Sequence, residues 1–111
     1  MKTVVVINRT TMGTGDDVLG ARILQTFLGK AGAALRTLDA ILFYNSGVKV
    51  LSDGSPCLPA LAALEQNGIE LIACGTCVDH FELRDRIRVG VIAGMDDLLR
   101  SMDAAERVIT L

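Results

Sequence analysis

Residues 4–7 form an uninterrupted run of β-branched aliphatic side chains (VVVI) with no polar residue between them. A strand with one face in water alternates apolar and polar residues, so an unbroken apolar run predicts a strand buried on both faces. Residues 40–44 (AILFY) and 69–73 (IELIA) are similar runs, the second interrupted only by Glu70. Three such runs favour a parallel sheet covered by helices.

Helical signals separate these runs. Asp16 and Asp17 are suited to start a helix after a polar loop, and apolar residues then recur at helical spacing up to Gly29 or Gly32. A second helix is expected from Pro56 or Pro59 to residue 66. A third follows from the spacing of four apolar side chains near the end of the chain, Met95, Leu98, Leu99 and Met102.

The alternation of strands and helices predicts an α/β fold, a three-layer α/β/α arrangement around a mostly parallel five-stranded sheet. The fourth and fifth strands are expected at residues 87–89 and 108–111. With 111 residues, half of them hydrophobic, the chain is expected to be a single domain over 1–111.

The charge of the chain excludes some partners. A net charge of −2 argues against nucleic acid, whose phosphates require clustered Lys and Arg. No basic-then-apolar leader opens the sequence, and no apolar run approaches the roughly 20 residues of a membrane helix. We therefore expect a soluble cytoplasmic protein without a membrane partner.

Three polar stretches directly follow the first three predicted strands: residues 8–17, 44–47 and 74–80. Ligands of open α/β sheets bind beyond the carboxyl ends of the strands. The sequence thus predicts a pocket built from Gly13, Gly15, Asn45, Ser46, Gly75 and Thr76. Gly13-Thr14-Gly15 does not complete a dinucleotide motif, because Val18 stands in the place of the third glycine.

Cys74 and Cys77 flank a Gly-Thr turn at the end of the third predicted strand. A helix start there would favour the thiolate form, so both are candidate catalytic residues. Three chemistries remain open: dithiol cycling, sulfur transport on one thiol, or metal binding with His80 and Cys57. Metal binding lacks the second well-spaced pair typical of zinc sites. The alternative is a non-catalytic module that binds a small ligand or partner, with cysteines that only pack or bind zinc.

Residues 82–88 contain three arginines and two acids. Their mixture predicts a solvated face, with docking of an acidic partner as the alternative.

Several segments together resemble the DsrE-like sulfurtransferase family, and within it the YedF-type branch linked to selenium metabolism. The resemblance rests on residues 12–20 (MGTGDDVLG), 43–48 (FYNSGV), 68–71 (GIEL) and 74–77 (CGTC). It spans nearly the whole chain, and the last of these segments, taken with 43–48, is its most specific part.

The resemblance implies a DsrE-type sheet and a sulfur-relay protein that carries sulfane sulfur, or selenium, as a cysteine persulfide without a cofactor. It places the carrier role on Cys74, with Cys77 as the second cysteine of the motif. It also implies a sulfur donor and an acceptor protein, with a TusA-like carrier as a candidate, and a homo-oligomer such as a trimer. Half of the residues are hydrophobic, a large share for a small domain, so part of the apolar surface is expected to be buried between subunits.

Overall fold

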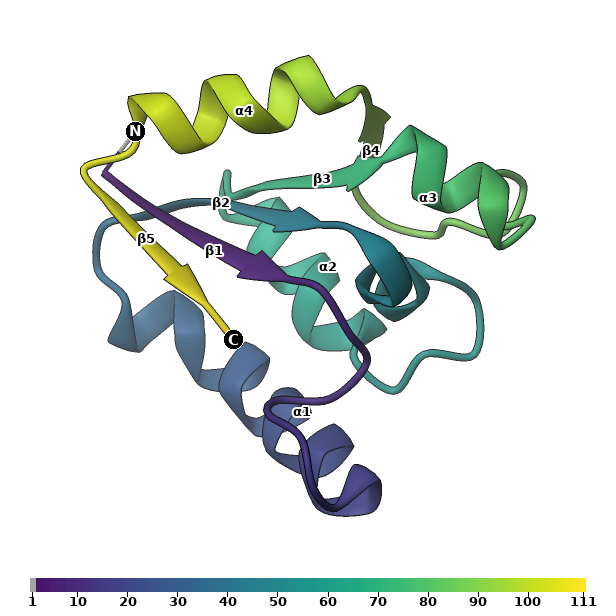
Figure 1. Cartoon of the computed structure of the whole chain (residues 1–111). Helices are drawn as coiled ribbons and strands as arrows, with labels where there is room; N and C mark the ends of the chain where they lie inside the picture. Colours follow the sequence, from purple (N-terminus) through teal and green to yellow (C-terminus); the bar gives the residue numbers. More distant parts are fainter. Residues whose placement is uncertain (1) are drawn as a thin grey trace.

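The computed structural model describes residues 2–111 and contains five parallel strands in the order β4-β3-β2-β1-β5 (Figure 1). The strands are β1 (Thr3–Ile7), β2 (Leu38–Phe43), β3 (Glu70–Cys74), β4 (Val91–Ala93) and β5 (Arg107–Thr110). Every residue of β1 is buried, as its unbroken apolar run predicts. The α/β sheet with five strands is confirmed.

The helices connect these strands in sequence. They are α1 (Asp17–Ala34), the 3-10 helix η1 (Asn45–Leu51), α2 (Leu58–Gln66), α3 (Gly75–His80) and α4 (Met95–Ala104). Asp16 caps α1 by accepting the Leu19 N–H at 2.8 Å, as expected of an acidic residue before a first turn. No helix in residues 2–111 combines the length and apolarity needed to cross a membrane.

The order of the strands distributes the helices unequally over the two faces. The crossovers from β1 to β4 all run in one direction, and α1 and α2 pack on the same face (Figure 1). The chain then returns from β4 to β5, so α4 lies on the opposite face. A single 10-residue helix thus covers the face that carries Val4, Val6, Leu42 and Ile72.

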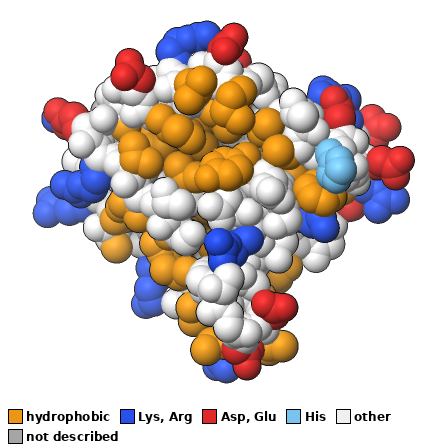
Figure 2. Space-filling view, in the orientation of Figure 1, with side chains coloured by type: hydrophobic (Ala, Val, Ile, Leu, Met, Phe, Trp, Pro, Cys, Tyr) orange, Lys and Arg blue, Asp and Glu red, His pale blue; other side chains and the backbone are white. Residues whose placement is uncertain are grey.

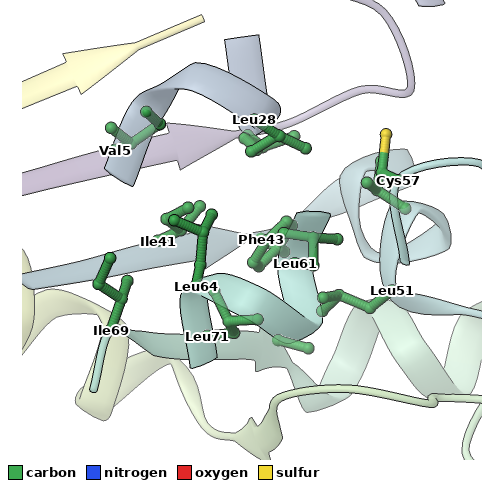
Figure 3. Close-up of a cluster of buried hydrophobic side chains, with 14 of the residues drawn as sticks. Val5, Leu28, Ile41, Phe43, Leu51, Cys57, Leu61, Leu64, Ile69 and Leu71 are labelled. Atoms are coloured by element: carbon green, nitrogen blue, oxygen red, sulfur yellow. The ribbon is translucent and has the colours of Figure 1, made fainter. Parts of the chain in front are cut away.

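The main hydrophobic core lies between the sheet and the pair α1–α2. Figure 3 shows Val5, Ile41 and Phe43 from the strands facing Leu28 and Leu61 from the helices. On the α4 face a smaller core forms around Leu98, which is fully buried. The pair α1–α2, the sheet and α4 are therefore the three layers that the sequence predicts, with one core at each of the two interfaces.

Two element boundaries differ from the prediction. The fourth strand is β4 (Val91–Ala93) and not residues 87–89, because the Arg88 N–H donates to the Leu51 carbonyl and Ile87 bridges Ser52, which ties that segment to η1. The first helix passes Gly29 and Gly32 and ends only at Ala34. Both glycines are therefore helix-interior residues.

Candidate functional site

The carboxyl ends of β1, β2 and β3 meet at one edge of the sheet, as parallel pairing requires. Asn8, just after β1, donates from Nδ2 to Tyr44 Oη at 3.3 Å, and the Tyr44 N–H donates to the Ile7 carbonyl at 3.1 Å. Next along the edge, α3 begins directly after Cys74 and packs on η1. The ends of these three strands are therefore connected, as the sequence predicts.

Cys77 is the thiol that this edge presents to solvent. It lies in the first turn of α3, is half-buried, and its Sγ accepts the main-chain N–H of Asn45 at 3.1 Å. Asn45 has a φ of 51°, in the left-handed region, and its own Oδ1 accepts the Ser46 N–H at 2.8 Å. Asparagine tolerates this conformation better than most residues. The backbone turn of Asn45 therefore directs an N–H at the sulfur of Cys77.

Gly47 allows this turn to sit close to β1. A Cβ at this position would clash with the Ile7 carbonyl oxygen and lie 2.8 Å from the Ile7 carbonyl carbon. Since that obstacle is backbone, a side chain would have to displace the start of η1. Gly47 thus fixes the distance between the Asn45 turn and the strand edge.

Cys74, which the sequence predicts as a candidate catalytic residue, is buried in the structure. Its side chain is 2% exposed and packs in the α4-side core with Val6, Ile72 and Leu98. Although Cys74 precedes the first residue of α3, its sulfur makes no capping hydrogen bond with that helix. The sequence does not determine whether Cys74 is exposed; in the structure β3 directs its side chain under α4, away from solvent.

The two thiols are neighbours, and this affects the acidity of Cys77. Burial raises the pKa of Cys77 above its ordinary value, the Asn45 N–H opposes that rise, and the adjacent Cys74 thiol adds to it. The prediction that a helix start lowers the pKa of this cysteine is therefore wrong. Desolvation and the second thiol outweigh the single main-chain donor.

The predicted pocket residues divide into two groups. Gly75 and Thr76 lie on α3 between the two cysteines, and Asn45 contacts Cys77 from η1, with Ser46 next to it in the chain. Gly13 and Gly15 do not join them. Both adopt positive φ values in the exposed loop that leads to α1, which Figure 1 shows on the opposite side of the molecule from α3. Their turn leads into α1, no hydrogen bond within residues 2–111 joins either glycine to the thiol pair, and their place in a thiol pocket stays a prediction.

Cys57 lies apart from the pair, at the end of the main core in Figure 3. Together with Lys49 and Ser55 it lines a cavity of about 330 Å³. Burial raises the pKa of Cys57, and a hydrogen bond with Ser55 partly opposes the rise. Cys57 is therefore separate from the thiol pair.

His80 packs its ring edge-on against Phe81, with ring centres 5.0 Å apart. Across residues 2–111 no three His, Cys, Asp or Glu side chains are grouped closely enough to hold a metal ion. The proposed zinc set of Cys74, Cys77, His80 and Cys57 is therefore not assembled.

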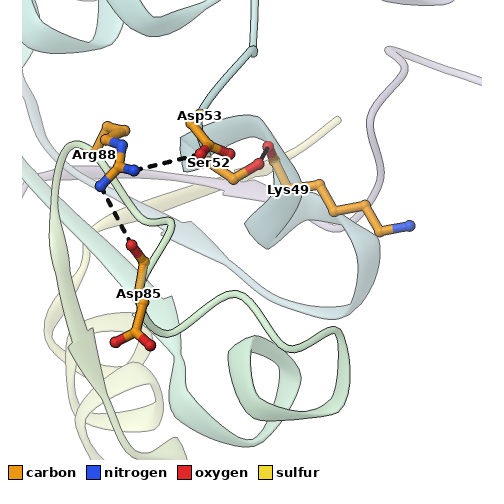
Figure 4. A network of polar contacts seen from close by, with 5 residues as sticks. All are labelled: Lys49, Ser52, Asp53, Asp85 and Arg88. Atoms are coloured by element: carbon orange, nitrogen blue, oxygen red, sulfur yellow. Dashed lines mark hydrogen bonds and ion pairs between the residues drawn. The ribbon is translucent and has the colours of Figure 1, made fainter.

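The arginine-rich segment after α3 is engaged within the chain. Arg84 pairs with Asp79 through two contacts of 2.7 and 3.0 Å, and this guanidinium lowers the pKa of Asp79. Arg88 bridges Asp53 and the Asp85 carbonyl, both at 3.3 Å (Figure 4). Two of the three arginines thus have acidic partners, which favours a solvated, self-paired face over an acidic docking partner.

The left-handed turn at Asn45 is missed by the sequence-based prediction, although the sequence contains a signal for it. The sequence predicts Asn45 only as a residue of the pocket, whereas in the structure its main-chain N–H donates to the Cys77 sulfur. An Asn-Ser-Gly segment directly after a buried strand is a signal for positive φ, since Asn and Gly are the residues that accept it.

Comparisons with known proteins agree on the fold. The whole chain, residues 1–111, matches the sequence profile described as the DsrE/DsrF-like family. No curated protein matches it. Among solved structures, the ychN protein from E. coli is similar at 16% identity and a TM-score of 0.70, with 100% of each chain covered.

Two further structures, both described as proteins of unknown function, have the same fold. MTH1491 from Methanobacterium thermoautotrophicum is 21% identical at a TM-score of 0.67, covering 96% of this chain and 97% of its own. BT1422 from Bacteroides thetaiotaomicron is 14% identical at a TM-score of 0.70, covering 99% and 95%. At these identities the likeness concerns the fold.

Proposed function

Because this chain belongs to the DsrE/DsrF-like family, we propose that it is a sulfur-relay protein that carries sulfane sulfur as a persulfide on Cys77, with Cys74 as the second thiol. The observation that carries the proposal is the half-buried Cys77 sulfur, which accepts the Asn45 N–H at 3.1 Å beside a second thiol. The resemblance places the carrier role on Cys74. Its burial leads us to assign sulfur uptake to Cys77 instead.

Uptake is a thiol exchange at the outer sulfur of a donor persulfide. The Cys77 thiolate attacks that sulfur, a new sulfur–sulfur bond forms, and the donor bond breaks to release the donor thiolate. The Asn45 N–H donates to the cysteine sulfur, so it stabilises negative charge there. An acceptor thiolate then attacks the outer sulfur, and Cys77 leaves as a thiolate.

Cys74 offers a second route of release. Its thiolate can attack Cys77 Sγ in the loaded protein, which forms the Cys74–Cys77 disulfide and expels hydrosulfide. A cellular dithiol must then reduce the disulfide to restore the pair. Burial of Cys74 keeps external persulfides from reaching it first.

The finer elements of the proposal concern partners and cargo. A donor and an acceptor protein are required, with a TusA-like carrier as a candidate. Selenium as an alternative cargo follows from the resemblance of residues 43–48 and 74–77 to the YedF-type branch. Elemental analysis after incubation with a selenium donor tests that extension.

Self-association is proposed from the α4 face. Met95, Leu99 and Val108 are all at least 44% exposed. Val108 pairs in register with Val4, so its side chain shares the face that α4 crosses. Figure 2 shows a broad hydrophobic patch beside α4. Such a patch is typical of a surface that another subunit covers.

Intact-mass spectrometry after incubation with glutathione persulfide tests the proposal. The wild-type chain is expected to gain about 32 Da, the mass of one sulfur atom carried as a persulfide. Cys77→Ser should not gain it, whereas Cys57→Ser, the matched control in a separate cavity, should gain it fully. Cys74→Ala should still load but lose the hydrosulfide-releasing route.

Two results would contradict the assignment. Loading of Cys77→Ser to the wild-type level would remove Cys77 from the reaction. Resistance of both Cys74 and Cys77 to alkylation in the folded chain would leave them as packing residues, the non-catalytic alternative.

A further inference from the structure

A groove runs between α4 and the edge of the sheet formed by β3 and β4, and neither Cys74 nor Cys77 lines it. It arises because α4 alone covers this face, and a helix about 10 Å wide cannot span five strands about 4.8 Å apart. Its volume is about 690 Å³. This is within the size range of pockets that bind ligands.

The floor of the groove is apolar. Ile72 from β3 and Val91 and Ala93 from β4 line it, facing Ala104 of α4. Val91 is 59% exposed, an unusual position for an aliphatic side chain next to a core. β4 is the end strand of the sheet and pairs with β3 alone.

The end of the groove near the start of β3 is acidic. Glu65 and Glu70 both line it, and none of the ion pairs within residues 2–111 includes either. Glu65 is held in place by the Gly90 N–H, which donates to its Oε2 at 2.8 Å. The third carboxylate, Asp97, is paired with Arg100 at 3.0 Å. Two uncompensated negative charges therefore flank an apolar floor.

We propose that this groove binds an extended segment of a partner protein in which a Lys or Arg is flanked by aliphatic residues. The aliphatic side chains contact Val91 and Ala93, and the cation contacts Glu70 and Glu65. The wall formed by the 10 residues of α4 is about 15 Å long. Five residues of extended chain span about the same length. A hydrophobic groove of this length, with charged residues at one end, suits an extended segment whose side chains fit the groove and whose cation meets the acids.

An NMR titration of the full ¹⁵N-labelled chain tests the proposal with three capped peptides. The probe is Val-Lys-Val-Lys-Val, and the matched peptides carry norleucine or Glu in place of Lys. The Lys peptide should shift the amides of Gly68, Val91 and Ser101, and leave those of Asn45 and Thr76 unmoved. It should bind more tightly than the norleucine peptide, by up to about fivefold for each exposed charge pair formed.

Substitutions in the groove separate charge from apolar contact. Glu70→Lys should reverse the preference between the Lys and Glu peptides, and Glu70→Gln should reduce the binding of the Lys peptide alone. Val91→Ser should weaken the Lys and norleucine peptides equally. Asp103→Lys is the matched control, because Asp103 is an exposed acid of α4 that does not line the groove.

Three results would overturn the proposal. They are equal binding of the Lys and norleucine peptides, an absence of groove shifts at millimolar peptide, or a groove occupied by a second copy that the Lys peptide cannot displace. Each variant is checked for a dispersed amide spectrum, so a folding defect is recognised. Sulfur loading of Cys77 is independent of all these outcomes.

Discussion

Replacing Gly47 by Ala tests the close packing that holds the Asn45 turn against β1. The added Cβ would clash with the backbone carbonyl of Ile7, which cannot move without disturbing β1, the buried strand paired to both β2 and β5. Overpacking of this kind costs about 1–3 kcal/mol of unfolding free energy. The displaced turn should also carry the Asn45 N–H away from the Cys77 sulfur.

Equilibrium urea unfolding followed by circular dichroism measures the effect. For a domain of this size the loss corresponds to a fall in the midpoint on the order of 1 M. Gly29→Ala is the matched control, because Gly29 lies inside α1 with no atom within 4 Å of an added Cβ. That variant should gain about 0.5–1 kcal/mol, since alanine favours helix over glycine.

A Gly47→Ala variant that unfolds at the wild-type midpoint, with an unchanged rate of Cys77 alkylation, would refute this reasoning. Such a result would mean that η1 can move without a loss of unfolding free energy, and that the contact between Asn45 and Cys77 does not depend on the position of η1.

Further outcomes follow from the same structure. The alkylation rate of Cys77 should keep rising beyond about pH 8.5, the ordinary pKa of a thiol, because burial and Cys74 raise its pKa; a plateau below pH 8 would contradict this. Asn45→Gly should preserve that pH profile and Asn45→Val should disturb it, because glycine accepts the φ of 51° whereas a β-branched valine is strained there. The folded chain retains the Cys57 proton to higher pH than the unfolded chain, so unfolding free energy should fall as pH rises above about 8.5, and less steeply in Cys57→Ala; equal slopes in urea unfolding would argue against it. Leu99→Asp should reduce the mass measured by light scattering if the α4 face associates, and an unchanged oligomer would place the interface elsewhere.

The parts of the fold that the sequence predicts are those determined by local pattern. The run at residues 4–7 predicts a buried strand because four β-branched side chains without a polar partner have few other stable settings. The capping role of Asp16 is equally local, since it depends on a side chain and an amide three residues away.

The parts that the sequence does not predict depend on contacts between distant segments. Residues 87–89 and 91–93 both contain β-branched aliphatic side chains, and the contacts of Arg88 with Leu51 and of Ile87 with Ser52 hold the first segment outside the sheet. Cys74 is buried because α4, some 20 residues later, packs on its face of the sheet. The polar loop after β1 likewise runs toward the start of α1, a path that no local pattern in its residues determines (Figure 1).

Locating the transferred sulfur along the chain tests the central claim most directly. After loading with glutathione persulfide and alkylation, trypsin should release residues 50–84 as one peptide that contains all three cysteines. Fragment ions that separate Cys74 from Cys77 should carry the added mass of about 32 Da on the Cys77 side only. Added mass on Cys74 or Cys57, with none on Cys77, would contradict the account.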